Sequence, residues 1–193
     1  METNKYEKFA RNKTIPPELR NVILKALSFY PDLLDVKIDF EFNEHIRKSV
    51  MQAQPRYVSM LRGRKRRSYL IKISRWFSLK GKKMPIHELP EDVLVGWIGH
   101  ELGHITDYMR RNDWSMLLFG LGYYTSKSFI IAAERVADSF AIDHGLGDYI
   151  LATKDFILHQ AGMSERYIRR IQRLYLPPEE IMLMMENKPV EDE

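Results

Sequence analysis

The sequence of 193 residues contains no cysteine. This absence excludes disulfide bonds and thiolate metal sites, so any metal ion must be bound by histidine, aspartate or glutamate. It also fits a reducing compartment, and we expect a cytoplasmic protein. The remaining composition, with 45% hydrophobic and 29% charged residues, is that of an ordinary globular protein with room for one hydrophobic core.

Long hydrophobic runs are also lacking. The most apolar stretch, WSMLLFGLGYY at residues 114–124, is far shorter than the roughly 20 residues of a membrane-spanning helix. The beginning of the chain, METNKYEKFARNKT, has no apolar segment of the length that a secretory signal requires. We therefore expect no transmembrane segment and no secretory leader.

The excess of positive charge is modest and local. The formal net charge is +4, and much of it comes from RGRKRR at residues 62–67, whereas residues 190–193 (VEDE) are acidic. We interpret the basic run as the solvated tip of a β-hairpin. The alternative is a contact with nucleic acid, an anionic lipid or an acidic partner. That contact would use Arg62, Arg64, Lys65, Arg66 and Arg67.

The pattern of the N-terminal half predicts one helix and a small sheet. Apolar residues recur at helical spacing over residues 18–30, behind a pair of prolines that suit a first turn. Residues 36–42 (VKIDFEF) alternate apolar and charged side chains, as a strand with one buried face does. Two β-rich runs, residues 56–61 and 68–77, flank the basic segment and predict a hairpin. We expect a small antiparallel or mixed sheet ahead of the helical half.

Helices are predicted from residue 89 onward. The first begins at Pro90 with two acidic residues in its first turn and ends at Arg110 and Arg111, the charge arrangement that favours the helix dipole. Spacing, capping residues and stop signals predict further helices at residues 128–144, 148–161, 164–176 and 179–187. The expected fold is thus α+β, with a single domain at residues 1–187 and an acidic tail at residues 188–193.

The helix beginning at Pro90 contains GWIGHELGHITDY at residues 96–108. Positions i and i+4 of a helix share one face about 5 to 6 Å apart, so His100 and His104 can both point an imidazole nitrogen at one ion. Glu101 is rotated by roughly 100° about the axis, which keeps it out of that pair but within reach of a water molecule beside the ion. In this H-E-x-x-H pattern the glutamate acts as general base.

The apolar setting of these residues supports a metal site. A helix that is apolar on most sides lies deep in the protein, where each unpartnered polar group costs on the order of 1 to 3 kcal/mol. Three glycines, Gly96, Gly99 and Gly103, each reduce helix propensity by about 1 kcal/mol relative to alanine, which predicts a close approach of another segment. The structural alternative is a buried helix whose histidines are satisfied by neighbouring protein groups.

A catalytic zinc normally takes three protein ligands, so a third is required. A metzincin sequence is excluded because Asp107 and Arg110 stand where its glycine and third histidine belong. Downstream, a second apolar helix offers Glu134 and Asp138, two carboxylates that are again four residues apart. By itself this spacing is also common on solvent-facing helices with salt bridges, for which Arg135 is a candidate partner.

With HELGH at residues 100–104 and E-x-x-x-D at residues 134–138, flanked by AERVADSFA, the sequence resembles the gluzincin clan of zinc metallopeptidases. Within it, the chain is similar to the prenyl-protein and heat-shock membrane protease family and to the compact minigluzincins. The spacing of the two motifs is also similar to that of bacterial repressor-cleaving zinc proteases. The resemblance implies one Zn²⁺ per chain, bound by His100, His104 and Glu134. Asp138 is then expected to orient a liganding histidine through a hydrogen bond.

The same resemblance implies a zincin-like fold and a proteolytic activity. The sheet would pack on the motif helix, and a peptide or protein substrate would add to its edge strand, for which residues 68–77 are the candidate. Zinc-activated water would hydrolyse the peptide bond with Glu101 as general base. No flanking motif singles out the group that stabilises the oxyanion. The candidates are His144, Tyr149, His159, Arg166 and Arg169.

Two alternative functions stay open from the sequence. The first is a zinc-binding protein without hydrolytic activity, a regulator or peptide-binding protein on the gluzincin scaffold. Glu101 argues against it, because zinc retention alone does not need this residue. The second is a module that binds nucleic acid or a membrane surface through the basic hairpin, in a salt-sensitive manner.

Overall fold

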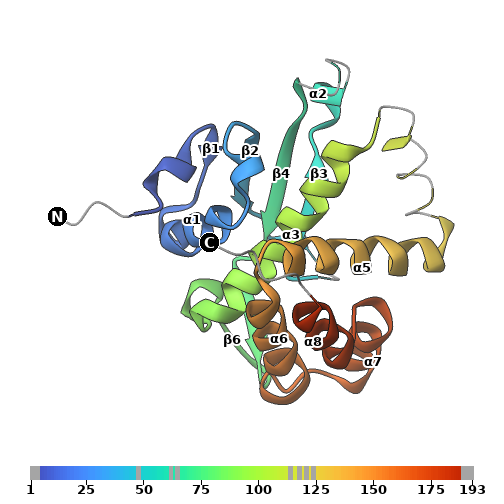
Figure 1. The fold of residues 1–193 in the computed structure, drawn as a ribbon. Helices are drawn as coiled ribbons and strands as arrows, with labels where there is room; N and C mark the ends of the chain where they lie inside the picture. The colour runs from blue at the N-terminus through green and yellow to red at the C-terminus, as the bar shows by residue number, and fades with distance from the viewer. Residues whose placement is uncertain are drawn as a thin grey trace.

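The computed structural model describes residues 5–46, 49–60, 63, 66–112, 115–116, 119, 122 and 125–187. It has the predicted α+β architecture, with a small sheet in the N-terminal half and helices in the C-terminal half (Figure 1). The long helix α3 (Glu91–Arg110) runs through the centre and packs against α1 (Arg20–Ser28), the sheet and the later helices. Both halves of the chain are thus built on α3.

The main sheet is mixed and has the strand order β1-β2-β4-β3. β2 (Lys37–Phe42) lies parallel to both β1 (Lys13–Thr14) and β4 (Ser68–Ile73), and β3 (Met51–Pro55) runs antiparallel to β4. The predicted strand at residues 36–42 is confirmed as β2. A separate two-stranded sheet pairs β5 (Trp76–Leu79) with β6 (Lys82–Pro85).

Two strand predictions were wrong. Residues 68–77 do not form one edge strand, because β4 ends at Ile73 and lies between β2 and β3. Its run of consecutive buried residues is typical of a central strand covered on both faces. The edge next to α3 is β3, which precedes the residues expected to form a strand. Those residues, 56–61, contain the short helix α2 (Tyr57–Met60), whose first turn is closed by a hydrogen bond from Ser59 N–H to the carbonyl oxygen of Arg56.

Arg67 does not belong to a solvated basic tip. Its side chain is buried, and Nη1 donates to the carbonyl oxygens of Tyr108 (3.1 Å) and Arg111 (2.8 Å). Both carbonyls lie at the C-terminal end of α3, where a cation also favours the helix dipole. Of the other basic residues, Arg66 is exposed. Arg62, Arg64 and Lys65 lie outside the described residues.

The predicted helices of the C-terminal half are confirmed. They are α5 (Lys127–Asp143), α6 (Gly147–Asp155) with a following π-helical turn η6 (Phe156–Gln160), α7 (Glu165–Leu174) and α8 (Pro178–Glu186). Short 3₁₀ turns connect the N-terminal elements at Glu7–Ala10, Pro17–Leu19, Pro31–Leu33 and Ile86–Glu88. None of the helices in the described ranges has both the length and the apolar character that a membrane span requires. The predicted acidic tail lies outside those ranges.

Glycines allow α5 and α6 to approach α3 closely, as their placement on the helix predicts. A Cβ atom on Gly103 would lie within 3.0 Å of the Ala137 carbonyl oxygen of α5, and one on Gly96 would clash with the Tyr149 carbonyl of α6. Because both obstacles are backbone atoms, no side-chain rotation relieves the clash. The lack of a Cβ atom at Gly103 and Gly96 therefore allows the short distances from α3 to α5 and α6.

We expect Gly103→Ala to lower the free energy of unfolding by about 1 to 3 kcal/mol, the usual cost of overpacking, despite the better helix propensity of alanine. The added methyl group must push α5 away from α3 at Ala137. Urea denaturation measures the change. Gln172→Ala, on the exposed face of α7, is the control and should change stability by less than about 0.5 kcal/mol. Equal stability of the two variants would contradict the close contact.

Candidate metal centre

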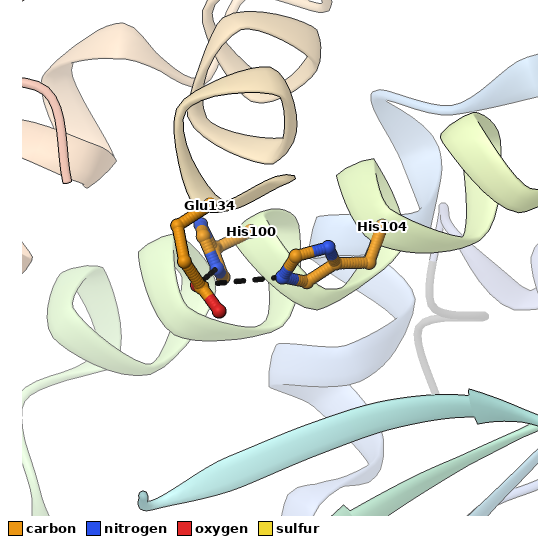
Figure 2. Close-up of side chains that lie close together, drawn as sticks. All are labelled: His100, His104 and Glu134. Carbon is orange, nitrogen blue, oxygen red and sulfur yellow. Dashed lines mark hydrogen bonds and ion pairs between the residues drawn. The ribbon is translucent and has the colours of Figure 1, made fainter. Parts of the chain in front are cut away.

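Three potential metal ligands converge where α5 crosses α3. Their ligand atoms all lie within 4.8 Å of one another, and all three side chains are buried. The Nε2 atoms of His100 and His104 are 3.1 and 3.5 Å from the same Glu134 oxygen, Oε2. Figure 2 shows the Glu134 carboxylate reaching from α5 toward both imidazole rings. The structure thus brings together the three residues that the sequence predicts as ligands.

The donor set and its spacing fit a metal ion. Four-coordinate zinc binds nitrogen and oxygen donors at about 2.0 to 2.2 Å, which places neighbouring donors about 3.3 Å apart. The two distances to Glu134 are close to that value. Imidazole nitrogen and carboxylate oxygen are donors that zinc and other divalent transition metals accept. The cluster of His100, His104 and Glu134 can therefore hold a metal ion.

The charges around the cluster point to a divalent cation. Glu101, Glu134 and Asp138 are buried acids that contribute three formal negative charges, and buried Lys154 contributes one positive charge. With both histidines neutral, as metal binding requires, these groups leave a formal charge of about −2 in the interior, and buried charge is costly unless it is compensated. A divalent cation at the cluster would neutralise this charge.

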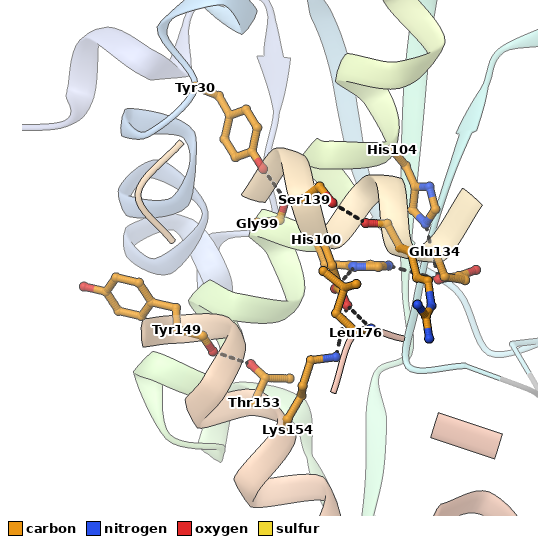
Figure 3. A network of polar contacts seen from close by, with 12 residues as sticks. Tyr30, Gly99, His100, His104, Glu134, Ser139, Tyr149, Thr153, Lys154 and Leu176 are labelled. Carbon is orange, nitrogen blue, oxygen red and sulfur yellow. Dashed lines mark hydrogen bonds and ion pairs between the residues drawn. The ribbon is translucent and has the colours of Figure 1, made fainter. Parts of the chain in front are cut away.

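Asp138 orients His100. Nδ1–H of His100 donates to Asp138 Oδ1 at 2.8 Å, so that Nε2 faces Glu134 and the ion position. A carboxylate on the far nitrogen of a liganding histidine fixes the ring and increases its basicity. The second oxygen, Oδ2, accepts from the Leu176 N–H and from the Lys154 ammonium, each at 3.0 Å (Figure 3). The position of Asp138 four residues after Glu134 is therefore explained by its hydrogen bond to the first histidine.

His104 is held differently. Its Nδ1 is buried and has no hydrogen-bond partner among the residues that the structure describes. The ring instead stacks on Tyr108 one turn along α3, with centroids 6.0 Å apart and an interplanar angle of 18°. Packing, rather than a hydrogen bond, thus orients the second histidine.

Glu101 lies beside the cluster and is held by the edge of the sheet. Its Oε2 accepts a hydrogen bond of 2.6 Å from the Ala53 N–H of β3. Burial raises the pKa of this carboxyl group, although His104, His100 and the bond from Ala53 oppose the shift. A carboxylate whose pKa is moved toward neutrality is suited to accept and release a proton.

Without a metal ion, a proton occupies the same cluster. Burial alone would lower the pKa of His100, but hydrogen bonds to Asp138 and Glu134 outweigh it and raise the pKa to about 10. Burial would likewise raise the pKa of Glu134, but His104 and His100 hold it well below its ordinary value. The metal-free site is therefore a buried ion pair between a protonated His100 and an ionised Glu134.

A cleft lined by His100 and Glu101 opens to the solvent. Its walls come from β3, α3, α6, α7 and the segment after α7. The polar or aromatic side chains that the sequence reasoning missed here include Lys154, Tyr167, Arg170 and Tyr175. The ring of Tyr175 lies beside the first histidine, with its centroid 5.3 Å from that of His100.

The predicted oxyanion donors do not line this cleft. The ring of His144 stacks on Tyr30 with centroids 4.2 Å apart, and its Nδ1 hydrogen-bonds the carbonyl oxygen of Phe140. The Tyr149 ring packs against Phe29 at the other side of α6.

The remaining candidates are exposed. His159 pairs with Asp155 on the surface, and Arg169 pairs with Glu165. Arg166 is exposed on the outer face of α7. The helical period of α7, read from the sequence, would have shown which of its arginines points toward the cleft. Residues 167, 170, 171 and 174 share one face, so Arg170 points inward where Arg166 and Arg169 do not.

Comparison with protein-family models, with curated proteins and with solved structures finds no match. The functional argument therefore rests on the residues of the site, their distances and their charges.

The pKa of His100 predicts how the metal-free protein responds to pH. Because this pKa is higher in the folded than in the unfolded chain, the folded state binds the proton more tightly. The resulting stability is complete below the unfolded pKa of about 6.5 and is lost as the pH rises through about 10. Urea unfolding in the presence of a chelator should show a falling free energy of unfolding across this window.

An added metal ion should show the opposite trend, because it displaces the proton and its contribution grows as the pH rises. His159→Gln, which removes an exposed histidine, is the control and should keep the wild-type slope. A metal-free protein whose stability is independent of pH in this window would contradict the buried ion pair.

Proposed function

We propose that this chain is a zinc metallopeptidase of the gluzincin type, with a zincin-like fold, that hydrolyses peptide bonds. One observation carries the proposal. The donor atoms of His100, His104 and Glu134 converge, and the buried carboxylate of Glu101 lies beside them on a cleft open to solvent. A purely structural metal site would not need Glu101, a buried acid that neither binds the ion nor orients a ligand.

The residues of the chain have distinct roles in this proposal. Zinc bound by the cluster would polarise the substrate carbonyl and lower the pKa of a water molecule. Glu101 accepts the proton of that water and transfers it to the leaving amine, a role suited to its raised pKa. Asp138 keeps Nε2 of His100 directed at the ion.

The substrate is a peptide or protein segment that adds to β3. The hydrogen bonds of Val50 O and Arg56 N with β4 place the backbone groups of Ala53 on the opposite, outer edge. On that edge, Ala53 N–H donates to Glu101, and the Tyr108 hydroxyl donates to Ala53 O at 3.4 Å. A peptide pairing there exchanges these bonds for its own and releases Glu101 toward the cleft.

Tyr175 is the proposed donor to the oxyanion. Burial, together with the nearby Glu134, raises the pKa of its hydroxyl well above the ordinary value, so that it keeps its proton. A protonated hydroxyl on a ring beside His100 can donate to the negative charge that develops on the carbonyl oxygen. This assignment replaces the candidates from the sequence, which lie away from the cleft.

Elemental analysis of Glu134→Ala tests the ligand set. The wild-type chain should carry one zinc that dialysis against a chelator removes and added zinc restores. Glu134→Ala should lose most of it, since two histidines remain as ligands. Glu180→Ala is the control, because this half-exposed glutamate of α8 pairs with Arg135, the residue next to Glu134 on α5. Full retention of zinc by Glu134→Ala would remove the assignment.

Glu101→Gln separates metal binding from catalysis. The variant keeps the shape of the side chain, so it should retain one zinc per chain. Peptidase activity, measured by mass spectrometry on a mixture of unfolded peptides, should fall by about 10²-fold or more without the general base. Activity that survives this substitution would exclude the proposed mechanism, and a wild-type protein that binds zinc without cleaving any peptide would favour a binding role.

A further inference from the structure

Lys154 is a buried cation in contact with the polar network behind the ligands. It lies on α6 with 6% of its surface exposed, and its Nζ is 3.0 Å from Asp138 Oδ2. The ammonium also lies over the ring of Tyr175, 5.0 Å from its centroid. Lysine is almost never buried to this extent unless it is paired. Asp138 and the aromatic ring are the partners that hold it there.

The two oxygens of Asp138 have separate partners. Lys154 and the Leu176 N–H both donate to Oδ2, which leaves Oδ1 for Nδ1–H of His100. The terminal torsion of an aspartate is broad, so donors on opposite sides are needed to fix the carboxylate plane. Without Lys154, Oδ2 would keep one backbone donor. The orientation of His100 would then depend on a less constrained carboxylate.

We propose that Lys154 is a positioning residue of the metal centre, which fixes the Asp138 carboxylate and through it the ring of His100. The inference rests on the proposed zinc site. It goes beyond that site because Lys154 touches neither the ion position nor the ligands. Its charge also balances that of Asp138, so Asp138 can remain ionised in the interior.

The competing explanation is that Lys154 only attaches α6 to its neighbours. The adjacent residue provides a matched comparison. Thr153 is equally buried on the same helix, and its hydroxyl hydrogen-bonds the Val93 carbonyl oxygen of α3 at 3.0 Å. It holds α6 against α3 and has no bond to Asp138. Substitutions at the two positions therefore separate helix packing from the positioning of the ligand.

The experiment measures the zinc dissociation constant by competition with a chromophoric chelator. We expect Lys154→Met to weaken zinc binding by about tenfold, the lower end of the range for partners behind a metal ligand. Thr153→Val should lose stability in urea and keep the wild-type zinc affinity. The visible spectrum of the cobalt-substituted protein is a second readout, and it should change in Lys154→Met and not in Thr153→Val.

A double-mutant cycle with Asp138→Asn shows whether Lys154 acts through Asp138. In the Asp138→Asn background, Lys154→Met should leave the zinc affinity unchanged. If Lys154→Met does not fold, Lys154→Gln replaces it in every comparison, because its shorter amide side chain is uncharged and can still donate a hydrogen bond. If Lys154→Met weakens zinc binding equally in the wild-type and Asp138→Asn proteins, Lys154 does not act through Asp138 and the proposal is overturned.

The outcomes separate this inference from the proposed function. A wild-type protein that binds no zinc overturns both. A wild-type protein that binds zinc, combined with a Lys154→Met variant that binds it equally or more tightly, overturns only the role of Lys154. Weaker binding in Lys154→Met, with unchanged binding in Thr153→Val, supports the positioning role.

Discussion

The close contact between α3 and α5 is the constraint on which the candidate site depends. Glu134 precedes Ala137 by one helical turn, and Ala137 is where the α5 backbone meets Gly103. Helix axes in proteins are about 8 to 10 Å apart, depending on the side chains at the contact. Because Gly103 has no side chain at this contact, α5 approaches α3 closely enough for the Glu134 carboxylate to come within hydrogen-bonding distance of His100. Since metal–ligand bonds tolerate deviations of about 0.2 Å, a displaced α5 would separate the ligands.

Charge compensation explains why several polar residues occur in the interior. Among the residues described, the buried acids at the site face His100, Lys154 or a backbone N–H. The buried guanidinium of Arg67 faces the carbonyl end of α3 at the other end of the motif helix. In each case the burial of a charge is offset by a partner supplied by a distant segment. These pairs therefore help to specify which segments of the chain meet at α3.

Local signals predicted local structure well. The helices follow from period, caps and stop residues, and the cluster follows from two i, i+4 spacings on apolar helices. The strand order was not predictable in this way, because parallel pairing of β2 with β4 joins segments about thirty residues apart and leaves no local pattern. The same limit applies to Arg67, which contacts α3 some forty residues later. The wall of the cleft was missed for another reason, since the choice of Arg166 and Arg169 ignored the period of α7.

If the site cleaves peptides as proposed, the bond between Ala53 N–H and Glu101 sets an energetic threshold for its substrates. A hydrogen bond to a charged group contributes about 1.5 to 3 kcal/mol, which corresponds to a factor of about 10 to 100 in an equilibrium. An incoming chain must supply that energy from its own backbone bonds along the strand. Isolated amino acids and tightly folded loops cannot do so, whereas an extended chain can. In the proposed peptidase, the resting bond would thus favour substrates that are long and extended.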